Sequence, residues 1–184
     1  KVLMGIRDQI RPGVKEDLNK LKKLGVKNLI VLSGDNQGTV DLVAGELGLT
    51  KAHGHMLPED KSAYIKKLQD QGQIVAFVGD GVNDSPSLAL AEIGIAMGSG
   101  TDVAIETSDV VLMNSDFSRL PHALGLTKAT ARNMRQNIFI AVGVVIILLL
   151  SVFFSDWMNM SIGMLVHEGS ILVVILNGMR LLRY

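Results

Sequence analysis

The chain has 184 residues, of which 48% are hydrophobic and 4% aromatic, and its 18 Lys and Arg residues balance 18 Asp and Glu residues. This balance argues against a nucleic-acid-binding protein, because such proteins normally carry a basic excess. There is no cysteine, so disulfide frameworks, zinc-finger spacings and thiolate catalysis are excluded. The zero net charge is unevenly distributed. Residues 1–126 carry 13 Lys and Arg against 16 Asp and Glu, or −3, whereas residues 127–184 carry 5 against 2, or +3. We therefore expect two parts in different surroundings.

Residues 1–126 alternate short apolar runs with helical patterns. Continuous apolar runs that end in Ser or Gly are typical of buried parallel strands, and they occur at residues 28–33 and 74–79. Weaker strands are expected near residues 2–6, 93–97 and 110–112. Segments bounded by Pro or Gly predict helices from Pro12 to Gly25, over 37–47 and over 58–71. The alternation predicts an α/β domain with a mainly parallel sheet, whose sites lie at the carboxyl ends of the strands.

Two loops at these strand ends carry groups suited to phosphate chemistry. Ser33, Gly34 and Asp35 follow the first apolar run and offer a hydroxyl and flexible backbone N–H groups at the start of a helix, where a phosphoryl group can be held. Asp80 and Asp84 lie four residues apart on the glycine turn GDGVND, so both carboxylates can converge on one small site. Carboxylate oxygens beside phosphate are the ligands that Mg²⁺ prefers.

Three other polar side chains lie between these two loops. Lys61 follows Pro58 at the start of the third expected helix, and its ammonium group could offset a phosphoryl charge, although a lone lysine there is more often a solvated surface residue. His53 and His55 are separated by one residue and no third ligand accompanies them. We interpret the two histidines as surface or strand-end residues rather than a metal site.

The last third of the chain is apolar. Residues 138–154 form an uncharged run of seventeen residues, and residues 157–179 form a second stretch long enough to cross a bilayer core of about 30 Å. We expect a hairpin of two membrane-spanning helices with a very short turn, which carries only Asp156. Because basic residues flank the other ends of both spans, those ends are expected on the cytoplasmic side. The basic residues are Lys128, Arg132, Arg135, Arg180 and Arg183.

His167 and Glu168, in the sequence HEGS, lie near the middle of the second span. A charge at mid-bilayer is unfavourable by about 2.5–3.5 kcal/mol on insertion scales, so ionisable residues there normally have a function. The pair offers a nitrogen and an oxygen ligand, which suit Zn²⁺, Co²⁺ or Fe²⁺ better than Cu⁺. Ser170 adds an oxygen about one helical turn away. The structural alternative is that Glu168 is protonated, or paired with another helix, and only packs the bundle.

Together these motifs resemble a known family. The ordered set Ser33, Lys61, Asp80 and Asp84 is similar to the last three motifs of the haloacid-dehalogenase superfamily, and the surrounding residues narrow the resemblance to the P-type ATPases. The stretch ending in VLSGD resembles the lead into the family's TGD-type loop, with Ser where Thr is more usual, MLPEDK its P-x-D-K element, and GDGVNDSPSLALAEIGIAMGSGTDVA its hinge signature. HEGS followed by ILVVILNGMRLL resembles the last membrane helix of the cobalt, iron and zinc exporters, although Ile171 stands where members often have Thr.

The resemblance implies a partial haloacid-dehalogenase-like (Rossmann-type) α/β domain with a parallel sheet over residues 1–126, followed by a linker helix and two transmembrane helices over 127–184. It implies an ATP-driven exporter of Zn, Co, Fe or Cd that is phosphorylated on an aspartate and resides in the cell membrane as a multi-pass protein with the soluble domain cytoplasmic. The implied residue roles are the following. Ser33, Gly34 and Asp35 form the loop that holds the phosphoryl group, Lys61 offsets its charge, Asp80 and Asp84 hold Mg²⁺, and His167, Glu168 and Ser170 bind the transported ion.

The chain departs from the family pattern in one large respect. The phosphorylated aspartate of the family sits in a DKTGT motif, which this sequence lacks. The nucleotide-binding domain that binds most of the ATP, the actuator domain and the earlier membrane helices are also missing. We therefore expect the chain to act with the remainder of the same pump and to hydrolyse no ATP alone. The alternatives are a membrane-anchored phosphatase of the superfamily, a pump for K⁺ or another hard ion, and a non-catalytic membrane module.

Overall fold

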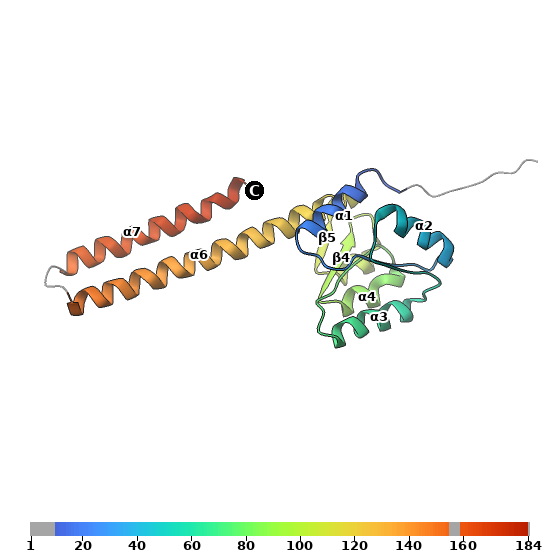
Figure 1. Ribbon diagram of the computed structural model, residues 1–184, viewed down its shortest axis with the longest axis horizontal. Helices are drawn as coiled ribbons and strands as arrows, with labels where there is room; N and C mark the ends of the chain where they lie inside the picture. The colour runs from blue at the N-terminus through green and yellow to red at the C-terminus, as the bar shows by residue number, and fades with distance from the viewer. Residues whose placement is uncertain (1–9, 155–158, 184) are drawn as a thin grey trace, which may run out of the picture. The chain divides into compact units, whose positions relative to one another are not determined.

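The computed structural model describes residues 10–154 and 159–183 (Figure 1). The strand expected near residues 2–6 and the turn expected at residues 155–156 lie outside the described residues. The residues up to His122 form one compact unit, and those from Ala123 onwards form a second. Each unit is described by itself.

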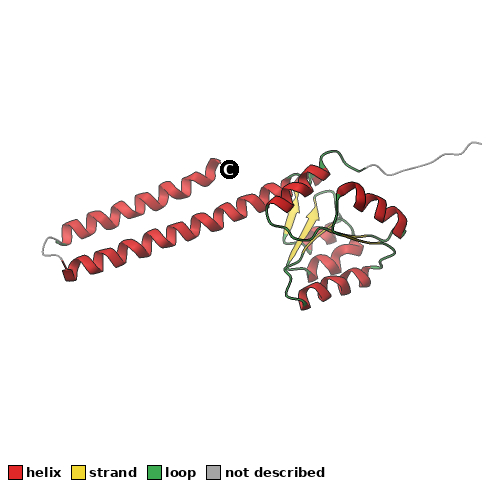
Figure 2. Ribbon diagram, viewed as in Figure 1, coloured by secondary structure: helices red, strands yellow, loops and turns green. Residues whose placement is uncertain are grey.

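The first unit alternates helices with parallel strands (Figure 2). The predicted α/β domain with parallel strands is therefore confirmed. Its elements are α1 (Val14–Lys23), β1 (Ile30–Leu32), α2 (Gln37–Leu47), β2 (Lys51–His53), α3 (Pro58–Asp70), β3 (Ala76–Gly79), η1 (Val82–Asp84), α4 (Ser85–Leu90), β4 (Ile93–Met97), α5 (Asp102–Glu106), β5 (Val110–Leu112) and η2 (Met113–Ser115).

The described strands form two sheets rather than one. β1 pairs with β2, with Ile30 opposite Lys51, while β3, β4 and β5 pair in that order, with Ala76 opposite Ile93. Among the described strands, β1 and β3 are thus each paired on one side only. An unpaired strand edge presents a row of N–H and C=O groups that can pair with another strand. Both edges can therefore accept a further strand.

Local capping explains why two of the predicted helices, α2 and α3, form where they do. Asn36 accepts a hydrogen bond from the Thr39 N–H at 2.9 Å at the start of α2, and Gly48 ends that helix with a φ of 67°. Pro58 occupies the first turn of α3, where it needs no N–H partner. Asp60 accepts a hydrogen bond from the Leu57 N–H at 3.0 Å and satisfies a further free donor at that end.

Three short elements were not anticipated from the sequence: β2, α4 and α5. They are too short to show a periodic pattern, because three to six residues cover less than two helical turns or a few strand positions. Their place is set by packing instead. α4 packs against α3, β3 and β4, where Leu88 and Ile65 are only 1% exposed. These contacts give the loops at the carboxyl end of β3 a rigid base.

The second unit contains two long helices. α6 (Arg119–Phe154) has 36 residues and is continuous from the predicted linker through the first predicted span, a length of about 54 Å. α7 (Met160–Met179) begins at Asn159, whose side chain accepts a hydrogen bond from the Ile162 N–H at 2.9 Å, and η3 (Arg180–Arg183) follows it. Both long helices are long and apolar enough to cross a membrane.

Candidate functional site

The Ser33–Asp35 loop is bound by backbone hydrogen bonds to the loop that follows β2. The Ser33 N–H donates to the His53 carbonyl at 2.9 Å, and the Ser33 carbonyl accepts from the Met56 N–H at 3.0 Å. The Asp35 carbonyl accepts from the His55 N–H at 2.7 Å. These bonds hold the position of the predicted phosphate-binding loop with main-chain atoms alone.

The Gln37 side chain adds two hydrogen bonds between the same two segments. Its amide oxygen accepts from the Gly54 N–H at 2.6 Å, and its amide nitrogen donates to the Ala52 carbonyl at 3.2 Å. The two backbones approach so closely that a Cβ on Gly54 would lie 2.7 Å from the Gln37 Cα. Sequence reasoning did not single out Gln37 or Gly54. A glycine directly after a short strand was the one available signal of such a close approach.

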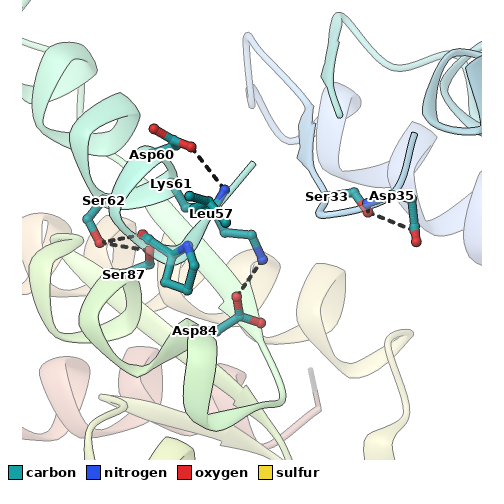
Figure 3. Close-up of polar contacts among 9 residues, drawn as sticks. Ser33, Asp35, Leu57, Asp60, Lys61, Ser62, Asp84 and Ser87 are labelled. Atoms are coloured by element: carbon teal, nitrogen blue, oxygen red, sulfur yellow. Dashed lines mark hydrogen bonds and ion pairs between the residues drawn. The ribbon is translucent and has the colours of Figure 1, made fainter. Parts of the chain in front are cut away.

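Within the loop, Ser33 and Asp35 are paired with each other. The Ser33 hydroxyl donates to Asp35 Oδ2 at 2.8 Å and accepts from the Asp35 N–H at 3.2 Å (Figure 3). Asp35 therefore orients the hydroxyl while its oxygen keeps a lone pair for another donor. Gly34 between them is exposed, so its backbone can be approached by an anion.

Lys61 and Asp84 form the closest ion pair of this unit's site. Lys61 Nζ lies 2.7 Å from Asp84 Oδ1, and the two side chains are 14% and 15% exposed. Nearby, Ser62 Oγ lies 3.2 Å from Ser87 Oγ, which joins α3, where Lys61 lies, to α4, which Asp84 precedes (Figure 3). A largely desolvated ion pair requires both partners, because removal of one leaves an uncompensated charge.

Asp80 lies at the carboxyl end of β3 with an exposed side chain and a firmly held backbone. Its carbonyl accepts from the Thr101 N–H at 3.0 Å, and a Cβ on Gly100 would lie 2.7 Å from that oxygen. Asp84 folds back over the same strand end, since a Cβ on Gly79 would lie 2.9 Å from Asp84 Oδ2. The structure thus brings both predicted carboxylates to one end of β3. The support from the 98–101 loop was not predicted.

The carboxylates of Asp80 and Asp84 fit a magnesium ion. In the part of the chain that the structure describes, no cluster of three or more His, Cys, Asp or Glu residues could hold a metal. Mg²⁺ does not need such a cluster, because it commonly uses one or two carboxylates together with water and a substrate phosphate. Asp84 Oδ1 is shared with Lys61, which leaves Oδ2 and the exposed Asp80 carboxylate as the donors.

The two halves of this candidate site are separate. Figure 3 shows Ser33 with Asp35 on one element and Lys61 with Asp84 on others. Among the described residues, no hydrogen bond or ion pair joins one pair to the other. The predicted phosphate-binding and magnesium-binding groups therefore exist, each locally ordered, without a direct bond between them.

The predicted metal-binding residues lie together on α7 but do not share one face. Adjacent residues are about 100° apart around a helix, so His167 and Ser170 lie within about 60° of each other, whereas Glu168 and Ser170 are about 160° apart. The Ser170 hydroxyl donates to the His167 carbonyl at 2.6 Å, which leaves its lone pairs available. His167 and Glu168 are exposed in this hairpin.

Comparison with known proteins identifies the family. The family model of haloacid dehalogenase-like hydrolases matches residues 2–92. A cadmium-transporting ATPase of Staphylococcus aureus is 42% identical over 98% of this chain and 25% of its own length. A manganese-exporting P-type ATPase of Mycobacterium bovis is 39% identical over 99% of this chain and 25% of its own length. The crystal structure of a zinc-transporting PIB-type ATPase in the E2·Pi state matches with a TM-score of 0.84 and 40% identity, over 96% of this chain and 28% of that one. The chain belongs to the heavy-metal P-type ATPases.

This P-type ATPase chain spans about a quarter of the length of the curated relatives it matches. The match to the haloacid dehalogenase-like model lies wholly in the first unit and covers the Ser33 loop, Lys61, Asp80 and Asp84. The family as a whole uses ATP and Mg²⁺. The resemblance to heavy-metal P-type ATPases and the fold class drawn from it are therefore confirmed. The resemblance of the HEGS segment to the last membrane helix of the cobalt, iron and zinc exporters stays a prediction.

Proposed function

We propose that this chain forms part of an ATP-driven exporter of a divalent transition-metal ion in the cell membrane, with the first unit on the cytoplasmic side. The pump works through an aspartyl phosphate whose aspartate lies in another part of the same protein. The remaining partners are the nucleotide-binding and actuator domains and the other membrane helices.

The observation that carries this proposal is the position of two of the open strand edges. Among the described strands β2 and β5 are also paired on one side only, but Ser33 and Asp80 directly follow β1 and β3. β1 and β3 are each paired on one side only among the described strands, and each ends at one half of the candidate site. A parallel strand that paired with both edges would place its own carboxyl end between the Ser33 loop and the Lys61–Asp84 pair. An aspartate at that position would complete the site, because functional groups of parallel sheets gather at this end.

In the completed site, this chain's residues bind and neutralise rather than react. The Gly34 N–H holds one oxygen of the phosphoryl group, and the Ser33 hydroxyl, which donates to Asp35 before the group binds, turns its proton to a second phosphoryl oxygen. Lys61 offsets negative charge. Asp80 and Asp84 Oδ2 hold Mg²⁺, which supplies further charge neutralisation when bound. Positioning and charge stabilisation are the main requirements of phosphoryl transfer.

The cargo site is proposed at His167 and Glu168, with Ser170 as an auxiliary oxygen. A nitrogen and a carboxylate favour a borderline divalent ion over Cu⁺. Because Glu168 and Ser170 point to opposite sides of α7, a single ion uses His167 with one of them, and other helices of the pump supply the remaining ligands. Zn²⁺, Cd²⁺, Co²⁺ and Fe²⁺ are the candidates.

The test uses the complete pump. We expect wild-type ATPase activity to be stimulated by at least one of these ions, with phosphoenzyme formed from ATP. Asp80→Asn should lower phosphoenzyme formation about 10²–10³-fold, as loss of a key charge-stabilising group does in other enzymes. Glu168→Ala should abolish metal stimulation while phosphorylation from inorganic phosphate persists. The exposed Asp70→Asn at the end of α3 is the matched control.

Other outcomes separate the alternatives. Metal-independent hydrolysis of phosphate monoesters would indicate a membrane-anchored phosphatase. Absence of any phosphoenzyme would indicate a non-catalytic membrane module, and stimulation by K⁺ alone would indicate a hard-ion pump. Vigorous ATP hydrolysis by this chain by itself would contradict the need for an aspartate from elsewhere.

A further inference from the structure

A ring of polar side chains joins the two long helices at the end of the hairpin away from residues 155–158. Asn177 Nδ2 on α7 donates to Asn137 Oδ1 on α6 at 2.9 Å, and Asn137 Nδ2 donates to Asn133 Oδ1 at 3.1 Å. Asn133 Nδ2 then donates to the backbone carbonyl of Asn177 at 2.6 Å. The bonds return to the residue from which they began. We call Asn133, Asn137 and Asn177 the amide ring.

The ring is both buried and directional. Asn133 is 7% exposed and is the only buried residue from position 126 onwards in the described part of the chain. Each of the three amide groups donates at least one hydrogen bond and accepts one, since Arg180 Nη1 donates to the remaining Asn177 Oδ1 at 3.1 Å. Hydrogen bonds tolerate little change of distance or angle, unlike contacts between apolar side chains. A shift of α7 along α6 would therefore break the ring at once.

The ring also closes the end of α7. The last carbonyls of a helix have no partner within the helix, and Asn177 lies in the last turn of α7. The Asn177 carbonyl accepts from the Arg180 N–H that caps the helix, and the Asn133 bond adds a second donor to it from the neighbouring helix. The end of α7 is thus held through the main-chain carbonyl of Asn177 as well as through its side chain. Rotation of the Asn177 side chain alone therefore cannot release it.

The spacing between the ring and the cargo residues matches half of a bilayer. Asn177 follows His167 by ten residues, which is about 15 Å along a helix. The hydrocarbon core of a bilayer is about 30 Å thick, so its midplane lies about 15 Å from either boundary. Arg180, one turn beyond Asn177, suits the boundary because its charge can reach water.

We propose that the amide ring sets the register of α7 against α6 and thereby fixes the depth of His167 and Glu168 in the membrane. Asn133, Asn137 and Asn177 are positioning residues for metal transport. This inference rests on the proposed function, in which His167 and Glu168 bind the transported ion.

The test measures register and metal affinity separately in the complete pump. Spin labels at Ile147→Cys and Leu165→Cys, both exposed on their helices, report the distance between α6 and α7. Asn133→Leu, Asn137→Leu and Asn177→Leu should each shift or broaden this distance. They should each raise the KM for Zn²⁺ or Cd²⁺ about tenfold, with kcat within about twofold and phosphorylation from inorganic phosphate unchanged. Because one break opens the whole ring, the Asn133→Leu/Asn177→Leu double variant should be no worse than the single variants.

Ser151→Ala is the matched control, since the Ser151 hydroxyl donates to the Ile147 carbonyl of its own helix and, among the residues that the structure describes, bonds to no residue of α7. It should change neither the label distance nor the KM.

An unchanged label distance in the three Asn variants would overturn the proposal. Additive losses of activity accompanied by loss of phosphorylation from inorganic phosphate would also overturn it, because they indicate general destabilisation. If the Leu variants do not assemble, Thr variants, too short to span these bonds, replace them under the same criteria. A shifted distance with a normal KM would instead contradict the placing of the cargo at His167 and Glu168.

Discussion

In the unit that ends at His122, the loops of the candidate site are held largely by their backbone groups, whereas in the hairpin the fixed polar groups contact one another across two helices. The Ser33 loop is bound by main-chain hydrogen bonds and by Gln37, and Asp80 is held through its carbonyl. In the hairpin, the amide ring is formed mainly by side chains. The difference teaches that the candidate site of the first unit is stabilised locally, whereas in our proposal the depth of His167 and Glu168 depends on a contact about 15 Å away.

Of these variants, Lys61→Met should cause the largest loss of stability in the first unit, because it removes the cation from the Lys61–Asp84 ion pair. The variant leaves Asp84 largely buried without its cation, and we expect a loss of stability of about 1–3 kcal/mol, below the range for fully buried pairs because the two side chains keep 14% and 15% exposure. Thermal unfolding of the complete pump in detergent measures it. Restoring stability by adding Asp84→Leu would confirm the cause, and equal destabilisation in the double variant would exclude it.

Gly54→Ala tests whether main-chain contact, rather than side-chain chemistry, holds the Ser33 loop. The added methyl would lie 2.7 Å from the Gln37 Cα and 2.8 Å from the Asp35 carbonyl oxygen. Overpacking of this kind usually destabilises a protein by about 1–3 kcal/mol, and here the Ser33 loop would be displaced to make room for the methyl group. We expect slower phosphoenzyme formation with unchanged metal KM. Gly45→Ala is the control, since no atom lies within 4 Å of its added methyl. A wild-type rate of phosphoenzyme formation in Gly54→Ala would show that the close contact at Gly54 does not hold the Ser33 loop in place.

Glu92→Gln should have the smallest effect, and it tests the hydrogen bond that supports the backbone just before β3. The Glu92 carboxylate accepts a hydrogen bond from the Val75 N–H at 2.8 Å just before β3, and this bond holds the pKa of Glu92 below its usual range. A lowered folded-state pKa contributes stability above the ordinary Glu value of about 4.3, and this contribution is lost as the pH falls through the folded value. Glu92→Gln should therefore lower the thermal midpoint slightly at pH 7, where the wild type has this contribution, and converge with the wild type at acid pH, so that the fall in midpoint between the two is flatter. An identical acid profile in both proteins would contradict the assignment.

The extent to which the structure could be predicted differs between the two regions. Helices α1 to α3 were predictable because Pro, Asn and Gly mark their ends, and the strands at 30–32 and 76–79 because their apolar runs are continuous. β2 was not, since Lys51–His53 has no apolar pattern and is ordered by pairing with β1. In the hairpin, apolarity predicted both helices, but no periodic signal links Asn133 to Asn177, which are 44 residues apart.

The candidate site shows the same limit. Ser33, Lys61, Asp80 and Asp84 were predictable from their order and from the loops that carry them. Gln37, Gly54 and Thr101 were not, because the contacts of the Gln37 side chain and of the Gly54 and Thr101 backbone depend on the folded chain. The opposite directions of Glu168 and Ser170 follow from helical geometry alone and divide a ligand set that had been treated as one.

The open edges of β1 and β3 also bear on how this protein can be produced. Exposed strand edges recruit any strand that fits, including those of other molecules, so this chain expressed on its own should aggregate. Co-expression with the segment that carries the missing aspartate should rescue its solubility, and the two pieces together would behave as a split enzyme.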